Sequence, residues 1–207
     1  ARLSIAVAGD VAMAALIPEI ERIFGAWRGS APPPTVPPRP DGAGTPRVTL
    51  VDRPGLTQSS LTVAMVGVPR LTPDYDALTM MNMILGGYYA SRLNANLREK
   101  HGYTYAAQSS FDLRRGPGPW SATGTVVRDK TGPAIQEIFA EIRRMRDEPV
   151  SEQELSDART RAIRRLPARF ESTDETAGAM VDIAVYGLPL DEYATLADRL
   201  RKLTPAD

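Results

Sequence analysis

The feature that most limits how this chain can fold is a proline-rich run at residues 31–46, APPPTVPPRPDGAGTP. Its seven prolines remove backbone N–H donors and fix the backbone angle φ, so the run can form neither a helix nor a central strand. Such a segment adopts an extended, polyproline-like conformation and acts as a semi-rigid connector. The run therefore predicts a linker at 28–46, between a short segment at 1–27 and a larger domain at 47–207.

The segment before the linker predicts one strand and one helix. Leu3, Ile5 and Val7 alternate with smaller or polar residues, which is the period of a half-buried strand. Apolar residues at helical spacing follow, and Pro18 is expected to kink that helix or to delay its start. The chain opens directly on a strand pattern and stops at a helix-start pattern, LTPAD. Both ends therefore predict a fragment of a longer protein.

The larger domain carries paired strand patterns, then two helices, then a second strand pair and a helical run. The second strand is apolar on both faces, which is typical of an interior strand. The order predicts an α+β fold with a mostly antiparallel sheet. The predicted strands span 47–52, 59–68, 103–115 and 119–129; the predicted helices span 72–85, 90–102, 135–145, 173–186 and 191–202, and SEQE at 151–154 predicts a capping box that opens one more.

Net charge and hydropathy limit the classes of partner that this chain can be expected to bind. Lys plus Arg (25) equals Asp plus Glu (25), so no overall field draws the chain to nucleic acid or to an anionic membrane. No apolar run is long enough to cross a bilayer. We therefore expect neither a nucleic-acid partner nor a membrane partner.

The residue types present argue against a metal centre within this chain. His101 is the only histidine and cysteine is absent, so a zinc site would need two or three carboxylates around one imidazole. No second histidine is available for a Ser-His-Asp arrangement beside it. The sequence predicts no metal ligands in this chain.

The stretch NLREKHGYTYAAQSSF, residues 96–111, is the one place where polar groups suited to chemistry gather. Arg98 lies near a predicted helix end, and a turn at Gly102 could fold the strand that carries Tyr105 back beside it. A guanidinium and a phenol at one point are two donors, suited to gripping a carbonyl or an oxyanion. From the residues alone a structural role stays open, in which Arg98 complements the helix dipole and Tyr105 is a half-buried strand aromatic.

The sequence resembles the pitrilysin and mitochondrial-processing-peptidase family of zinc peptidases, specifically the half of their clamshell that lacks zinc. The residues that carry the resemblance are LGGYYASRLNANLREKHGYTYAAQSSF (85–111), followed in family order by residues 127–155 and 186–207. The resemblance implies a half-clamshell domain with helices packed on one side of the sheet. It also identifies residues 1–27 as a strand and helix left from the end of the preceding domain.

In this family an inverted H-x-x-E-H motif on one domain holds zinc, and the other domain supplies an Arg and a Tyr seven residues later. Arg98 and Tyr105 have that spacing, so the resemblance implies that they contact the substrate near the scissile bond. Tyr103 is the rival phenol, because strand alternation should put it on the same face as Tyr105. A glycine-rich loop touches substrate in some relatives, and here only Gly86 and Gly87 represent it, which makes a full gating loop doubtful.

Two functions follow from the resemblance. The chain is either the non-zinc half of a metallopeptidase, with a zinc-bearing domain or subunit and a peptide as partners, or an inactive scaffold subunit, as in respiratory complexes. Zinc is expected in the partner domain and no cofactor in this chain, which alone should be inactive. The resemblance to exported bacterial members favours the periplasm. A family domain normally continues past LTPAD with a helix, a strand and another helix, so residues 1–27 could instead complete the sheet of the same or a second copy, giving a strand-swapped homodimer.

Overall fold

The computed structural model describes residues 3–29 and 44–207. Residues 30–43, which hold most of the predicted linker, lie outside the described residues. The described chain divides into two units, residues 3–29 with 162–197 and residues 44–161 with 198–207, and each unit is described by itself.

The second unit is built around a three-stranded antiparallel sheet with the strand order β1-β3-β2. The strands are β1 (Gln58–Val66), β2 (Thr104–Phe111) and β3 (Pro119–Val127). β1 pairs with β3 from Gln58↔Val127 to Val66↔Pro119, and β2 closes a hairpin with β3 at Phe111↔Trp120. The predicted hairpin and the predicted α+β class, with a mostly antiparallel sheet, are confirmed. The interior position predicted for β1 is wrong, because β1 forms one edge of the sheet within the described chain.

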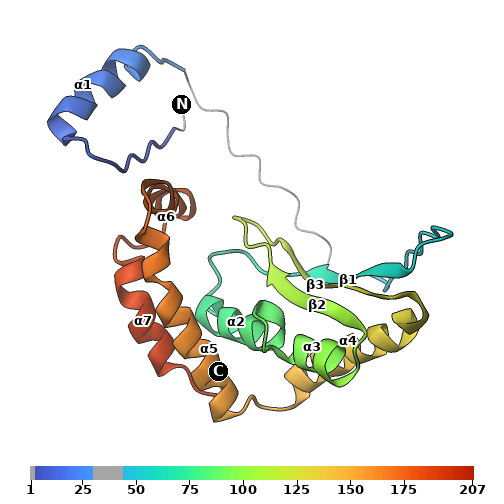
Figure 1. Cartoon of the computed structure of the whole chain (residues 1–207). Coiled ribbons are helices and arrows are strands. Elements are labelled where there is room, and N and C mark those ends of the chain that lie inside the picture. The colour runs from blue at the N-terminus through green and yellow to red at the C-terminus, as the bar shows by residue number, and fades with distance from the viewer. Residues whose placement is uncertain (1–2, 30–43) are drawn as a thin grey trace. The chain divides into compact units, whose positions relative to one another are not determined.

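Helices cover one face of this sheet (Figure 1). α2 (Tyr75–Asn82) continues into a π-helical turn, Met83–Gly87, and α3 (Arg92–Asn94) continues into a second one, Ala95–Lys100. α4 (Thr131–Asp147) follows a short 3-10 turn at Arg128–Lys130, and α5 (Glu152–Arg165) opens on the predicted capping box. The buried core lies between the sheet and α2, α3 and α4 with the two π-helical turns; it consists of Leu85, Leu93, Leu97, Ala107, Trp120, Ala122, Val126, Ala134 and Ile138.

The face of the sheet away from this core is polar. Side chains at alternate positions point to it, among them Thr62, Gln108 and Thr125, all exposed. An antiparallel sheet with one packed and one solvated face shows this alternation. The sequence pattern therefore places the core on one side of the sheet and leaves the other side open.

The strand predicted at 47–52 is absent. Residues 47–52 form no regular element, and Val48 and Leu50 are 94% and 86% exposed. A strand is stable only when its N–H and C=O groups pair with a neighbour and one face is buried. Within the described chain this segment has neither, so its strand-like composition does not produce a strand.

In the first unit, α1 (Met13–Phe24) carries Pro18 inside it, so the proline does not delay the helix start. The strand predicted around Leu3, Ile5 and Val7 does not form either, and these three side chains are about half exposed. The strand-swapped dimer stays a prediction. The helices predicted near the end of the chain are confirmed as α6 (Thr173–Tyr186) and α7 (Glu192–Lys202), with a 3-10 turn, Pro167–Phe170, before them.

Candidate functional site

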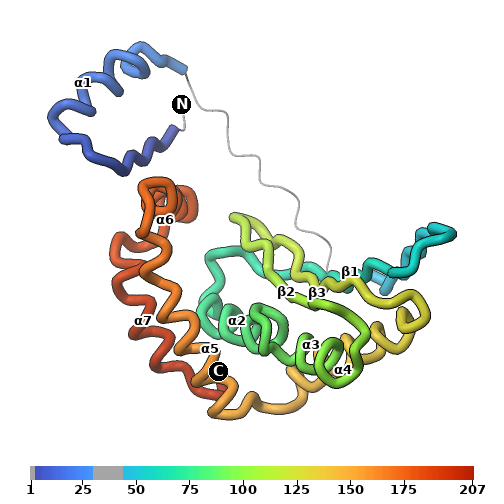
Figure 2. The backbone as a smooth tube through the Cα atoms, viewed as in Figure 1, coloured from blue at the N-terminus to red at the C-terminus, as the bar shows by residue number. Residues whose placement is uncertain are grey.

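Arg98 and Tyr105 come together because the chain reverses at Gly102. Arg98 lies on the π-helical turn Ala95–Lys100, which closes with the N–H groups of Gly102 and Tyr103 donating to the carbonyls of Arg98 and Leu97, at 2.9 and 2.8 Å. Gly102 adopts a left-handed φ of 63°, which a residue with a side chain rarely takes. The backbone then runs directly into β2 (Figure 2). The guanidinium carbon of Arg98 lies 5.0 Å from the centre of the Tyr105 ring.

We call Arg98 and Tyr105 the donor pair. The side chain of Arg98 is 27% exposed, and its guanidinium makes no hydrogen bond with any residue that the structure describes. Tyr105 is 83% exposed. The guanidinium Nε lies 3.4 Å from the Glu99 carboxylate. The terminal nitrogens of Arg98 and the hydroxyl of Tyr105 make no hydrogen bond with the described residues.

A β-bulge separates Tyr105 from Tyr103. Thr104 pairs with Val126 and Ala107 with Gly124, so two residues of β2 stand opposite one residue of β3. The Thr104 hydroxyl closes this bulge: it accepts from the N–H of Ala106 and lies 2.9 Å from the carbonyl oxygen of the same residue. A bulge interrupts the alternation of side chains and re-aims them.

The expectation that Tyr103 and Tyr105 share a strand face is therefore wrong. Tyr103 precedes β2, packs partly buried against the core and stacks on His101 with ring centres 4.8 Å apart. Tyr105 projects from the bulge beside Arg98. The structure assembles Arg98 with Tyr105 and leaves Tyr103 in a supporting position.

The two glycines before this region occupy different surroundings. Gly86 is buried, and a Cβ there would lie 2.4 Å from the backbone nitrogen of Ser109. Only a residue without a side chain allows the helix end to approach β2 so closely. Gly87 is exposed and lies beside Tyr88 and Tyr89. Gly86 therefore sets helix–strand packing, whereas a Cβ at Gly87 would lie 3.2 Å from the carbonyl oxygen of Asn82.

Sequence reasoning did not single out Tyr89 as a site residue. The guanidinium carbon of Arg98 lies 4.3 Å from the centre of the Tyr89 ring, closer than to the Tyr105 ring. The Tyr89 hydroxyl donates to Glu99 at 3.2 Å, and the same carboxylate oxygen lies 3.4 Å from Nε of Arg98. The only sequence signal for this contact is the pair of tyrosines after the two glycines.

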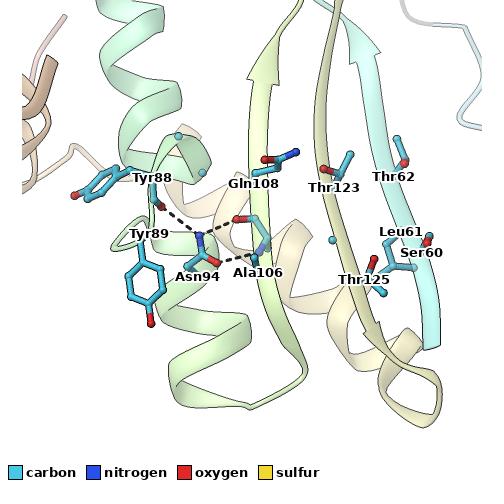
Figure 3. A pocket seen from close by; sticks show the side chains of 14 residues that line it. Ser60, Leu61, Thr62, Tyr88, Tyr89, Asn94, Ala106, Gln108, Thr123 and Thr125 are labelled. Atoms are coloured by element: carbon cyan, nitrogen blue, oxygen red, sulfur yellow. Dashed lines mark hydrogen bonds between the residues drawn. The ribbon is translucent and has the colours of Figure 1, made fainter. Parts of the chain in front are cut away.

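A cavity of about 640 Å³ opens over the polar sheet face (Figure 3). Gln108, Thr123 and Thr62 line it from the three strands, and Tyr88 and Tyr89 line it from the loop beside β2. No Lys, Arg, Asp or Glu lines this cavity among the described residues. Its wall offers hydroxyl, amide and backbone groups, which suit an uncharged peptide backbone.

Asn94 fixes the edge of β2 at this cavity. Its amide donates to the carbonyl of Ala107 at 2.8 Å and accepts from the N–H of the same residue at 2.9 Å, as a neighbouring strand would. It also lies 3.2 Å from the carbonyl of Tyr88. Asn82 covers the next edge position by donating to the carbonyl of Ser109 at 3.1 Å. These two amides pair with three backbone groups on the outer edge of β2, and Asn94 also ties the tyrosine loop to this strand.

The second tyrosine of the loop has a different partner. Arg161 lies over the Tyr88 ring, with 4.6 Å between the guanidinium carbon and the ring centre. Burial raises the pKa of the Tyr88 hydroxyl, and the nearby Asp157 carboxylate raises it further, while Arg161 opposes both. Tyr88 therefore keeps its proton through the neutral range and remains a possible donor beside the cavity.

The described residues contain no group of three or more His, Cys, Asp or Glu side chains placed to hold a metal ion. The imidazole of His101 lies 3.8 Å from the carboxylate of Glu137 and against the Tyr103 ring. Among the helices of the described chain, none is long and apolar enough to cross a membrane.

The model of the family described as "Peptidase M16 inactive domain" matches residues 1–162 of this chain. The chain belongs to the peptidase M16 inactive-domain family. In M16 proteases the zinc belongs to the partner catalytic domain, and the described part of this chain shows no side-chain group that could hold it. No curated protein matches the chain.

Solved structures agree with this assignment. The peptidase M16 inactive domain from Pseudomonas fluorescens is 26% identical, with a TM-score of 0.67, and covers 72% of this chain and 36% of its own. The periplasmic protease PqqL from Escherichia coli is 19% identical, with a TM-score of 0.71, and covers 96% of this chain and 22% of its own. The inactive peptidase domain of a proposed zinc protease from Bordetella parapertussis is 19% identical, with a TM-score of 0.60, and covers 77% of this chain and 85% of its own.

The last two structures are each 19% identical to this chain, so their similarity shows the fold alone. This M16 chain spans well under half the length of the Pseudomonas fluorescens and Escherichia coli chains that it matches. It therefore corresponds to one part of those longer proteins.

Proposed function

We propose that this chain is the non-zinc half of an M16 zinc endopeptidase and that the donor pair contacts the peptide near its scissile bond. One observation carries the proposal: the guanidinium of Arg98 stacks against aromatic rings, its Nε lies 3.4 Å from Glu99, and its two terminal nitrogens make no hydrogen bond with the described residues. The hydroxyl of Tyr105 adds a second donor in the same place. Donors held ready at one point stabilise the negative charge that develops on a carbonyl oxygen during peptide hydrolysis.

The partner in this proposal is the catalytic domain of the protease, in the same polypeptide or in a separate subunit. That domain supplies the zinc and the base that activates water. This chain supplies the donor pair and the uncharged cavity wall, along which an extended peptide could lie. Gly87 lies at the cavity edge, and Gly86 and Tyr103 support the site indirectly through packing.

Periplasmic location belongs to the same proposal. It is supported by the fold likeness to a periplasmic protease. Fractionation of the source cells tests it directly: recovery of the protein with periplasmic markers supports the location, and recovery with cytoplasmic markers contradicts it.

The test is peptide cleavage by the complete enzyme, assembled from this chain and its zinc-bearing half. Arg98→Ala and Tyr105→Phe should each lower kcat by about 10²-fold, because each removes a donor to the transition state, while zinc content and thermal stability stay unchanged. Arg164→Ala, at an exposed arginine on α5, is the matched control for charge. Tyr103→Phe is the matched control for the phenol and should have a much smaller effect.

Equal activity of the two donor-pair variants and the wild type would contradict the peptide-contact role. A separate outcome, in which the assembled wild-type complex cleaves no peptide, would favour the scaffold function.

A further inference from the structure

The guanidinium of Arg98 is enclosed by residues from three separate segments. Tyr89 comes from the loop after the π-helical turn Met83–Gly87, Glu99 adjoins Arg98 itself, and Tyr105 comes from the bulge of β2. Their contacts with the guanidinium span 3.4 to 5.0 Å. We propose that Tyr89 is a positioning residue, whose ring holds the Arg98 guanidinium with its donors directed at the peptide. This proposal rests on the function proposed above.

The chemistry of the contact explains why aromatic rings suit this task. A carboxylate that pairs with a guanidinium in the usual forked manner uses the same N–H donors that a substrate carbonyl would need. A ring face attracts the guanidinium through its π-electrons and leaves the in-plane N–H groups available. With Tyr89 at 4.3 Å, the ring face stabilises the charge of Arg98. Glu99 lies near Nε alone, at 3.4 Å and not in the forked arrangement, so the donors of the two terminal nitrogens stay available among the described residues.

The hydrogen bond of the Tyr89 hydroxyl restrains how the Tyr89 ring is oriented against Arg98. Its hydroxyl donates to Oε1 of Glu99, the oxygen that lies near Nε of Arg98. The ring is thereby tied to the residue next to the arginine that it holds. An arginine side chain otherwise samples many rotamers, and this arrangement reduces the side-chain entropy that is lost when substrate binds.

Core packing does not account for the placement of Tyr89. Its side chain is 61% exposed, so burial of the ring contributes little. The neighbouring Tyr88 is half-buried and stacks with Arg161 instead. The two consecutive tyrosines therefore have different partners, and the more exposed one contacts the donor pair.

The first part of the test uses NMR of the 207-residue chain and does not depend on peptidase activity. In the wild type, the ring currents of Tyr89 and Tyr105 should shift the Arg98 side-chain protons upfield. Tyr89→Leu should remove a large part of that shift, and Tyr89→Phe, which keeps the ring, should retain it. Tyr75→Leu is the matched control, because Tyr75 stacks with Arg70 at 3.5 Å outside the cavity lining.

The second part measures cleavage by the assembled enzyme. Tyr89→Leu should lower kcat by about threefold to thirtyfold, the range of a cation–π contact, with a smaller change in KM. Tyr89→Phe should stay within about threefold of the wild type, since it loses only the bond to Glu99. Tyr75→Leu should leave kcat unchanged.

The two parts separate the possible failures. Unchanged Arg98 shifts in Tyr89→Leu overturn the positioning role, whatever the activity. Unchanged kcat in Tyr89→Leu overturns it too, provided that Arg98→Ala lowers kcat. If Arg98→Ala itself leaves kcat unchanged, the proposed function fails, and the NMR result alone supports or overturns Tyr89 as the residue that holds Arg98.

Discussion

Arg92 and Arg98 lie in one helical segment, yet their guanidinium groups have different partners. Arg92 is buried, and its Nε and one terminal nitrogen donate to the two carboxylate oxygens of Glu154 at 2.6 and 2.9 Å. Arg98 stacks against two rings and donates to none of the described residues. A paired, buried guanidinium ties elements together, whereas a stacked one keeps donors for another molecule.

The Arg92–Glu154 pair predicts a pH-dependent part of the stability. Hydrogen bonds from Arg92, and then those of Ser151, lower the pKa of Glu154 from 4.5 to about 2. Because the folded-state pKa lies below the unfolded one, the pair stabilises the fold fully above about pH 4.5 and loses that contribution as the pH falls toward 2. Glu154→Gln should lower the free energy of unfolding by about 2 kcal/mol or more at pH 7.

Urea denaturation between pH 2 and pH 7 checks this prediction. The free energy of unfolding of Glu154→Gln should change less with pH than that of the wild type within that window. Glu152→Gln, at an exposed glutamate on the same helix, is the control and should follow the wild type. A Glu154→Gln curve parallel to that of the wild type would contradict the role of the pair.

At the scale of elements, β2 combines a covered edge with a local bulge. Asn94 pairs with both backbone groups of Ala107 and Asn82 with the carbonyl of Ser109, which leaves fewer groups on this edge for another strand. The bulge at Thr104 then turns Tyr105 out of the regular alternation. Helix side chains thus hold β2 in place, and the Tyr105 side chain of this strand lies beside Arg98 at the end of a helix.

Thr104→Val should change the direction in which the Tyr105 side chain points. Loss of the hydroxyl leaves the bulge without the bond to the Ala106 N–H, which should cost about 1 kcal/mol of stability and lower kcat of the assembled enzyme by about tenfold. Thr104→Ser keeps the hydroxyl and should restore both. Chemical denaturation and peptide cleavage provide the two measurements. Wild-type kcat in Thr104→Val would show that the bulge does not position Tyr105.

At the scale of the whole molecule, the family match indicates that zinc binding and the residues of this chain belong to two different domains. This chain belongs to the inactive half of M16 peptidases, and the zinc lies in the catalytic half. The cavity wall carries donors and hydroxyls and, within the described residues, no carboxylate that could serve as a base. Under the proposed function, the base and the zinc come from the partner domain.

The isolated 207-residue chain should show no peptidase activity and should hold well below one tightly bound zinc per molecule. Addition of the zinc-bearing half should produce cleavage of a quenched fluorescent peptide. Metal analysis of the purified chain and the peptide assay check these two expectations. One tightly bound zinc per chain, with hydrolysis that a chelator abolishes, would contradict the assignment of roles.

Local interactions made the helices predictable from the sequence. A helix pairs its own backbone over four residues, so apolar spacing and caps such as Ser151 with Glu154 are sufficient to indicate it. The hairpin was predictable for a similar reason, because its two strands adjoin one short turn. Likewise, Arg98 and Tyr105 stand on either side of one turn at Gly102, which made their convergence foreseeable.

Contacts between distant segments were decided only by the tertiary structure. A strand exists only if another segment pairs with it, which is why 47–52 and the run around Ile5 did not become strands although their composition favours it. The bulge in β2 depends on its register with β3, and the stack of Tyr89 on Arg98 depends on how a loop meets a helix end. The sequence alone determined local backbone states and candidate donors; the folded arrangement determined which tyrosines meet Arg98, because that depends on packing between segments that local patterns do not encode.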